Sequence, residues 1–220
     1  RPNGLNAKAM GERRLQFLVE SLKDLQQQLQ HVGQVLIIKQ QTPHLALTEL
    51  INKYNVDIIA RSQHAGVYEN RHWKLLQQQF PDREFVTEPS HTLFSADDLP
   101  FQLNQLPTSF TQFRKQVEDI ALPRPMLSPQ QLPPTPGPIA VDEIPQPVFQ
   151  PSKFTGGETA ALKHINDYFS KDLPASYKTV RNELDGWTNS TKFSPWLALG
   201  CLSVRHLASR LKNYEQTKVS

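Results

Sequence analysis

The densest group of side chains able to bind a ligand lies in residues 189–203, NSTKFSPWLALGCLS. This stretch offers three hydroxyls and one positive charge, from Ser190, Thr191, Ser194 and Lys192. Ser194 followed by Pro195 is typical of a helix start, where free backbone amides and the positive end of the helix dipole can bind phosphate. The stretch therefore fits a diphosphate site. Residue chemistry alone favours a simpler interpretation, a well-capped helix with a solvated lysine.

A second candidate is YKTVRN (177–182), in which Arg181 follows Tyr177 by four residues. An aromatic ring and a guanidinium group one helical turn apart can flank a planar ring or a phosphate. A helix face with a buried tyrosine and a surface arginine explains the same pattern, and the residues by themselves favour that interpretation.

The other reactive residue types predict no catalytic or metal site. The seven histidines are scattered, and none is spaced with another histidine or a cysteine for metal binding. Cys201 lies in an apolar helical stretch and is expected to be a core thiol. Asp97 and Asp98 are expected to cap a helix, and Trp187 and Trp196 to pack in the core. The chain has no glycine-rich dinucleotide motif, no phosphate-binding loop motif and no nucleophile elbow.

Composition narrows the class of protein. The chain has 220 residues, a formal net charge of +3, 18 prolines, 9 glycines and one cysteine. One cysteine excludes an internal disulfide framework, and no apolar run reaches the roughly 18 residues of a membrane span. The weak positive charge is compatible with a polyanionic partner without arguing for one. A soluble globular protein with a proline-rich interruption is expected.

The first 120 residues alternate between helical and strand patterns. Apolar residues spaced by three and four predict a helix over 11–32 that ends at Gly33, with one face made of Leu15, Leu18, Leu22, Leu25, Leu29 and Val32. Strands are expected over 34–40, 56–60 and 83–87, and helices over 42–53, 69–79 and 109–119, the last capped by Thr108 or Ser109. The alternation predicts an α/β fold with a Rossmann-like parallel sheet. No strand precedes the first helix, so the first strand of that sheet is expected to be missing.

The second half divides at a proline-rich segment. Ten prolines between 121 and 151 predict an extended interdomain linker, because proline excludes helix interiors and central strands. Beyond it the pattern is helical, with one helix from Gly157 ended by Pro174, a second over 175–184, and others starting at Pro195 and Val204. We therefore expect an α/β domain over 1–120, a linker over 121–151 and the beginning of an all-helical domain over 152–220.

Five collinear stretches carry a likeness to a known family: GERRLQFLVESLKDL (11–25), TLFSADDLPFQLNQLPTSFTQFRKQVE (92–118), FTGGETAAL (154–162), YKTVRN (177–182) and STKFSPWLALGCLSVR (190–205). Through them the chain resembles the cryptochrome/photolyase family, and within it the DASH cryptochromes. The resemblance implies an antenna domain, a long connection and a helical FAD-binding domain. It also implies a blue-light flavoprotein that splits cyclobutane pyrimidine dimers with an electron from the light-excited reduced flavin. Single-stranded DNA is the implied main substrate, because its lesion is already unpaired.

The resemblance also assigns cofactor contacts, residue by residue. The family's aromatic FAD contact matches Tyr177, and its phosphate-binding segment matches Ser190, Thr191, Lys192, Phe193 and Ser194. Glu69 matches an acidic contact to the folate antenna, 5,10-methenyltetrahydrofolate, but Tyr68 stands where relatives often carry a second acid. A solvated glutamate at a helix start explains Glu69 equally well. No catalytic residue and no metal ligand is assigned within the chain.

The resemblance leaves the biological role open between three alternatives. The first is a DNA-repair flavoenzyme, expected to be a monomer that binds single-stranded or damaged DNA and no membrane. The others are a blue-light photoreceptor that signals without repair and a shortened, non-catalytic relative. A bacterial origin would imply a cytoplasmic location. Since the family keeps the rest of its FAD pocket beyond the position of Ser220, residues 1–220 alone are expected neither to hold FAD stably nor to repair DNA.

Overall fold

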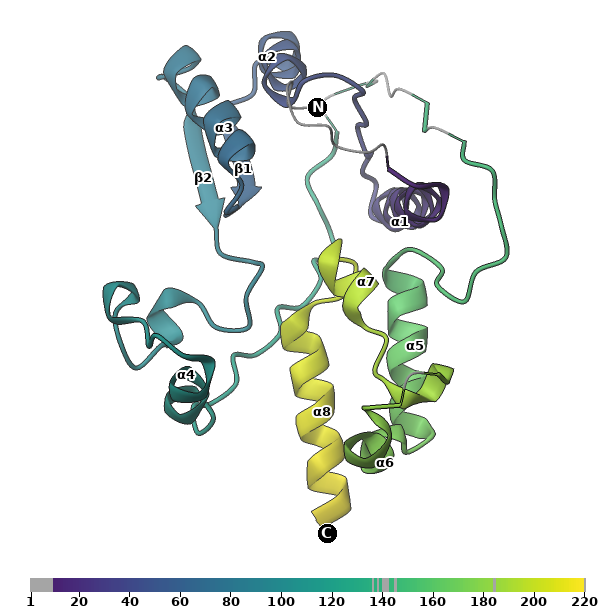
Figure 1. Ribbon diagram of the computed structural model, residues 1–220. Helices are drawn as coiled ribbons and strands as arrows, with labels where there is room; N and C mark the ends of the chain where they lie inside the picture. Colours follow the sequence, from purple (N-terminus) through teal and green to yellow (C-terminus); the bar gives the residue numbers. More distant parts are fainter. Residues whose placement is uncertain are drawn as a thin grey trace.

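A computed structural model describes residues 10–135, 137, 139, 143–144, 146–183 and 185–219 (Figure 1). Its first part contains α1 (Glu12–His31), α2 (Pro43–Tyr54), β1 (Ile58–Ser62), α3 (Val67–Gln79), β2 (Glu84–Glu88), the 3₁₀ turns η1 (Ala96–Asp98) and η2 (Leu103–Gln105), and α4 (Phe110–Val117). Its second part is helical, with α5 (Glu158–Ser170), α6 (Leu173–Val180), the 3₁₀ turn η3 (Trp187–Asn189), α7 (Ser194–Ala198) and α8 (Val204–Val219). This order confirms the predicted fold class. Among the described helices, none has both the length and the hydropathy needed to cross a bilayer.

The sheet consists of β1 and β2, which are parallel and paired with Ile59 opposite Phe85. Helix α3 connects the two strands and packs on them. Trp73 of α3 meets Phe85 edge to face, with ring centroids 5.0 Å apart. The buried residues of this small core are Ile51, Ile59, Trp73 and Leu76. The strand–helix–strand unit is the parallel arrangement that the alternating sequence pattern predicts.

Residues 34–40 form no strand, so that part of the sequence prediction was wrong. A strand needs a neighbour for its backbone hydrogen bonds, and in the described part of the chain β1 pairs with β2 alone. The side chains of Gln34 and Gln40 instead donate to the backbone carbonyls of Pro133 and Glu143. The apolar stretch thus lies beside the proline-rich segment. The next predicted strand, 56–60, begins two residues later than expected, at Ile58.

The described residues between 121 and 151 form neither helix nor strand, as their prolines predict. Three of those prolines lie outside the described residues: Pro136, Pro138 and Pro145. The end of the segment contacts α1, where the Gln16 side chain accepts from the Gln150 amide at 2.9 Å and donates to the Gln150 carbonyl at 3.0 Å. The domain boundaries at 121 and 151 stay a prediction.

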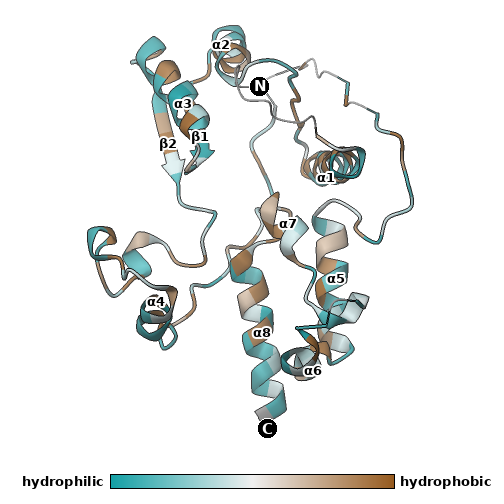
Figure 2. Ribbon diagram, in the orientation of Figure 1, coloured by the Kyte–Doolittle hydropathy of each residue, from teal (hydrophilic) through white to brown (hydrophobic). Residues whose placement is uncertain are grey.

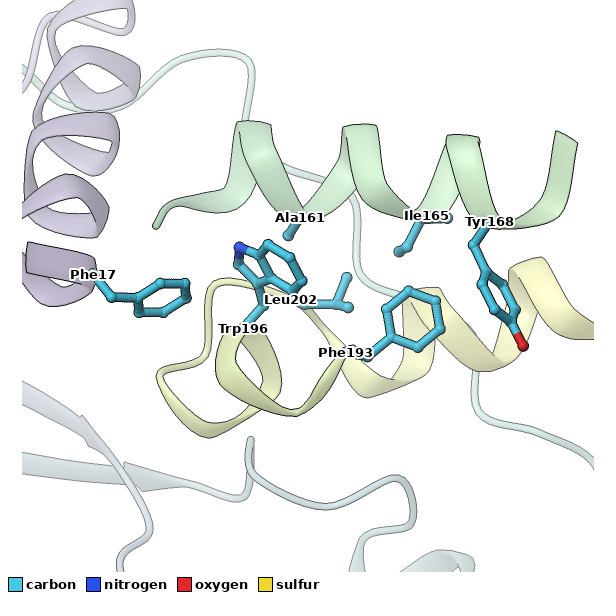
Figure 3. Packing of buried hydrophobic residues seen from close by; sticks show 7 residues of the cluster. All are labelled: Phe17, Ala161, Ile165, Tyr168, Phe193, Trp196 and Leu202. Carbon is cyan, nitrogen blue, oxygen red and sulfur yellow. The ribbon is translucent and has the colours of Figure 1, made fainter. Parts of the chain in front are cut away.

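The helical part has its own hydrophobic core between α5, α7 and the residues leading into α8 (Figure 3). Its buried members are Phe17, Ala161, Ile165, Tyr168, Phe193, Trp196 and Leu202. Hydrophobic residues of α8 lie mainly toward α7, whereas its C-terminal turns are largely hydrophilic (Figure 2). Pro174 lies in the first turn of α6, where its missing N–H is not needed. The second helix therefore spans Leu173–Val180 and not 175–184.

Helix α1 contributes to this second core through Phe17, whose ring centroid is 6.0 Å from that of Trp196. The buried side of α1 carries Gln16, Phe17, Val19 and Ser21. The predicted leucine face is mostly half-buried, and Leu25 is 46% exposed. Periodicity identifies an amphipathic helix, but the face that becomes buried depends on which element packs against it.

Two glycines allow α1 to hold the start of α5. The Gly156 amide donates to the Glu20 carboxylate at 2.7 Å, and the Gly157 amide donates to Ser21 Oγ at 3.0 Å. A Cβ atom on Gly156 would lie 2.1 Å from the Phe17 carbonyl oxygen, and Gly157 has a φ of +102°. Because α5 makes no cap with its own side chain, α1 supplies partners for its first amides from a distant part of the sequence.

Candidate functional site

The segment from Ser190 to Ser194 has a backbone suited to anion binding. Ser190 is extended, with φ −145° and ψ 164°. Lys192 has a φ of +56°, in the left-handed region, and Phe193 returns to the right-handed region at φ −74° and ψ −19°. A left-handed residue next to a right-handed one directs successive N–H groups into a common concavity, which binds anions. The sequence pattern contains no signal for this turn, because Lys192 is not a residue type that favours positive φ.

Most donors of this segment are available to a ligand. In the part of the chain that the structure describes, the amides of Lys192 and Phe193 have no acceptor, and neither do the hydroxyls of Ser190, Thr191 and Ser194. The Ser194 amide opens α7 and has no partner within that helix. Helix α7 is only five residues long, so its dipole contributes less than that of a longer helix would. The turn itself is the stronger anion-binding feature.

The helical core anchors the C-terminal side of this segment. Phe193 is 5% exposed and Trp196 is 2% exposed. The Trp196 indole N–H donates to the Thr155 carbonyl at 2.9 Å, just before the Gly156–Gly157 pair. A left-handed conformation costs a residue with a side chain about 1–2 kcal/mol. The surrounding packing must hold Lys192 in it.

His164 of α5 contacts the same segment, which the sequence analysis did not anticipate. Its Nε2 atom lies 2.9 Å from the Thr191 carbonyl oxygen. Its ring stacks on Trp196, with centroids 5.0 Å apart and an interplanar angle of 25°. A histidine at a polar position of a helix gives no sequence signal for a contact with a loop 27 residues away.

Tyr177 lies on α6 and is 37% exposed. Burial, followed by the neighbouring phenols of Tyr177 and Tyr214, raises the pKa of Tyr168. Tyr168 in turn meets Phe193 edge to face at 5.2 Å. Tyr177 and Phe193 therefore lie near the same tyrosine, but the described residues show no direct contact between Tyr177 and residues 190–194. The simpler expectation of a buried Tyr177 was wrong.

Glu69 lies in the first turn of α3, in the α/β part of the chain and away from α6 and α7 (Figure 1). It borders a cavity of about 300 Å³ that is also lined by Arg61, Tyr68, His72 and Trp73. The Arg61 guanidinium stacks over Trp73 at 4.5 Å. Glu69 itself is half exposed, and its carboxylate lies 3.8 Å from His64 Nδ1. The Glu69 carboxylate is thus a hydrogen-bond acceptor beside the Trp73 ring and the Arg61 guanidinium.

The fold brings together histidines that are far apart in the sequence. His44 and His72 have ring centroids 5.3 Å apart, and His64 and His91 have centroids 5.9 Å apart. No group of three or more histidine, cysteine or acidic side chains among the described residues could hold a metal ion. Neither histidine pair therefore belongs to a group that could hold a metal ion among the described residues.

The DDLPF stretch connects the two parts of the chain. Asp98 accepts from the Ser95 amide at 2.7 Å and from Ser95 Oγ at 2.6 Å, which confirms its predicted capping role. Arg205 of α8 donates from Nε to the Leu93 carbonyl at 3.1 Å and lies 3.8 Å from Asp98. The Ser95 hydrogen bonds, and then the Arg205 charge, hold the pKa of Asp98 below its usual value. Two of the five recognisable stretches thus meet in space.

Comparison with known proteins agrees with this architecture. A family model described as DNA photolyase matches residues 2–136. The Cryptochrome DASH of Idiomarina loihiensis is 45% identical over 94% of this chain and 47% of its own length. The Cryptochrome DASH of Vibrio parahaemolyticus is 40% identical over 95% of this chain and 47% of its own length. The chain thus spans about half the length of the curated relatives it matches.

Solved structures show the same relationship. A cryptochrome from Synechocystis sp. superposes with a TM-score of 0.85 at 35% identity, over 96% of this chain and 47% of that one. A class III photolyase from Agrobacterium tumefaciens shares the fold, with a TM-score of 0.80 at 19% identity over 96% of this chain and 46% of that one. The matched family model shows that this chain belongs to the DNA photolyase family, and the curated relatives that it resembles are Cryptochrome DASH proteins.

Proposed function

We propose that residues 190–194 bind the diphosphate of FAD in a light-dependent DNA-repair flavoprotein. Membership of the DNA photolyase family supports FAD as the cofactor. The observation that carries the proposal is the left-handed turn at Lys192, with φ +56° and free amides on both sides of it. Such a turn stabilises negative charge without depending on the dipole of the short helix α7.

Each part of the segment has a distinct role in this proposal. The amides of Lys192, Phe193 and Ser194 donate hydrogen bonds to phosphate oxygens, and the Lys192 ammonium group neutralises their charge. The hydroxyls of Ser190, Thr191 and Ser194 provide further donors. The buried Phe193 ring keeps the turn attached to the core. Tyr177 provides an aromatic contact from α6. These residues would hold FAD, and its reduced, light-excited form would supply the electron for splitting a pyrimidine dimer.

DNA is the proposed substrate of the whole protein, since the chain belongs to a family of DNA photolyases. We infer a preference for cyclobutane pyrimidine dimers in single-stranded DNA, because removing a lesion from a duplex stack costs unstacking energy. A photoreceptor that signals without repair would bind the same flavin. Dimer splitting under blue light by the purified full-length protein distinguishes the two roles.

The finer proposal for a second chromophore is a folate at the Glu69 cavity. The family relationship supports a second, light-harvesting chromophore as a general feature. A pteridine ring presents N–H donors, and the half-exposed Glu69 carboxylate offers an acceptor beside the Arg61–Trp73 stack. The cavity of about 300 Å³ is at the small end for a ligand site, so it suits one ring system and not a whole cofactor.

The FAD assignment is tested by the double substitution Lys192→Glu with Ser194→Ala in the full-length protein. Loss of one charge-assisted and one neutral hydrogen bond removes about 2–4 kcal/mol of binding free energy, so flavin affinity should fall about thirtyfold or more. A matched control is Lys212→Glu with Ser128→Ala, two exposed positions outside the segment. Equal flavin affinity in the two double variants would refute the assignment.

A further inference from the structure

We propose that His164 is a positioning residue that holds the turn at Lys192 in its anion-binding conformation. The inference rests on the proposed function of residues 190–194 as the diphosphate site. His164 belongs to α5, whereas the turn lies between η3 and α7. The contact therefore links the phosphate-binding segment to the helix that α1 holds through Gly156 and Gly157.

The hydrogen bond between His164 and Thr191 can have only one direction. His164 Nε2 lies 2.9 Å from the Thr191 carbonyl oxygen. A carbonyl oxygen can only accept, so Nε2 carries the proton and donates it. This assigns the Nε2–H tautomer to a neutral His164 side chain.

The geometry of the peptide unit then fixes the direction of the Lys192 amide. The Thr191 carbonyl and the Lys192 amide belong to the same planar, trans peptide, so they point in opposite directions. When His164 draws the carbonyl toward α5, the Lys192 N–H must point away from α5. The bond thus orients an amide that the proposed function uses, although His164 lies at the opposite edge of the peptide unit from that amide.

Aromatic neighbours hold the His164 imidazole itself in place. Trp196 stacks on it at 5.0 Å, and Phe193 and Trp187 approach it at steep angles, with centroids at 5.2 and 5.8 Å. Trp187 precedes the turn, whereas Phe193 and Trp196 follow Lys192. Rings from both arms of the segment therefore hold the histidine, and stacked and edge-to-face contacts restrict its orientation.

These contacts matter because the left-handed backbone conformation of the turn is intrinsically unfavourable for lysine. Lys192 has a φ of +56°, a conformation that residues with a side chain adopt only when their surroundings impose it. Without the His164 hydrogen bond, the Thr191–Lys192 peptide can rotate to a relaxed conformation. The amide then no longer faces the ligand.

The test compares His164→Phe with His164→Gln in the full-length protein. Phenylalanine keeps a ring among the aromatic neighbours but has no donor, whereas glutamine keeps a donor but has no ring. We measure the affinity of each apoprotein for FAD by flavin fluorescence and its stability by urea unfolding. The Phe variant should bind FAD about tenfold more weakly than the unmodified protein, while the Gln variant loses less than threefold. Stability should follow the opposite order, with the Phe variant the more stable.

Because FAD affinity and stability are expected to rank the two variants in opposite orders, the experiment distinguishes a positioning role of His164 from simple packing. If affinity follows stability, so that the Phe variant binds FAD as well as or better than the Gln variant, the proposal for His164 is refuted. If Lys192→Glu with Ser194→Ala also leaves affinity unchanged, the proposed diphosphate site itself fails. If that double variant weakens binding and the Phe variant does not, only the role of His164 is wrong.

Discussion

Replacing Gly156 with alanine should destabilise the protein by disrupting the packing of α5 against α1. The added Cβ would lie 2.1 Å from the Phe17 carbonyl oxygen and 2.6 Å from Ser21 Oγ. The Phe17 carbonyl oxygen belongs to the backbone of α1, and the Ser21 backbone amide lies only 2.8 Å from the added Cβ, so turning a side chain cannot relieve the contact. The start of α5 must therefore shift away from α1, and the shift breaks the hydrogen bonds from Gly156 to Glu20 and from Gly157 to Ser21.

The magnitude follows from the contacts that are lost. Overpacking a tight site costs about 1–3 kcal/mol. A hydrogen bond to a charged carboxylate contributes about 1.5–3 kcal/mol and a neutral one about 0.5–1.5 kcal/mol. The reduced freedom of the unfolded chain returns about 0.4–1 kcal/mol, because alanine is less flexible than glycine. A net loss of at least about 2 kcal/mol is expected for Gly156→Ala.

Urea unfolding followed by tryptophan fluorescence measures this loss, since Trp196 contacts Phe17 across the junction. Gly11→Ala is the control, because a Cβ there meets no atom within 4 Å. Because Gly11 is the N-cap residue of α1, Gly11→Ala should lower the free energy of unfolding by less than about 1 kcal/mol. If Gly156→Ala changes the free energy of unfolding no more than Gly11→Ala does, the described junction between α1 and α5 is incorrect.

Two further substitutions test the capping aspartate and the antenna proposal. Asp98→Asn should lower stability at pH 7, because Ser95 and Arg205 favour the ionised carboxyl and lower its pKa. That stabilisation is present above the ordinary aspartate pKa of about 4 and is lost as pH falls through the lowered value. Urea unfolding at several pH values should therefore show the two proteins converging in acid, while Asp97→Asn matches the unmodified protein throughout. Glu69→Gln should weaken binding of added 5,10-methenyltetrahydrofolate about tenfold without affecting FAD, as measured by absorbance. A folate affinity equal to that of Glu12→Gln would exclude Glu69 as the contact.

Several elements could be predicted from the sequence because their determinants are local. Gly33 adopts a φ of +74° just after α1, as a helix-ending glycine should. Ser109 caps α4 by accepting from the Gln112 amide at 3.4 Å. The proline-rich segment forms no helix or strand in its described residues, because each proline removes a backbone donor wherever it lies. The resemblance to the cryptochrome/photolyase family could likewise be recognised from the sequence, since it rests on contiguous stretches of residues.

The tertiary structure decided the features that join distant residues. Residues 34–40 have the composition of a strand, but strand formation depends on a partner that local sequence does not specify. The sequence named Lys192 as a candidate for its charge, whereas the fold places it in a left-handed turn. His164 reaches Thr191 across 27 residues, and Ser21 reaches Gly157 across 136. Such hydrogen bonds leave no local pattern, because their energy is realised only after the chain has brought the two groups together.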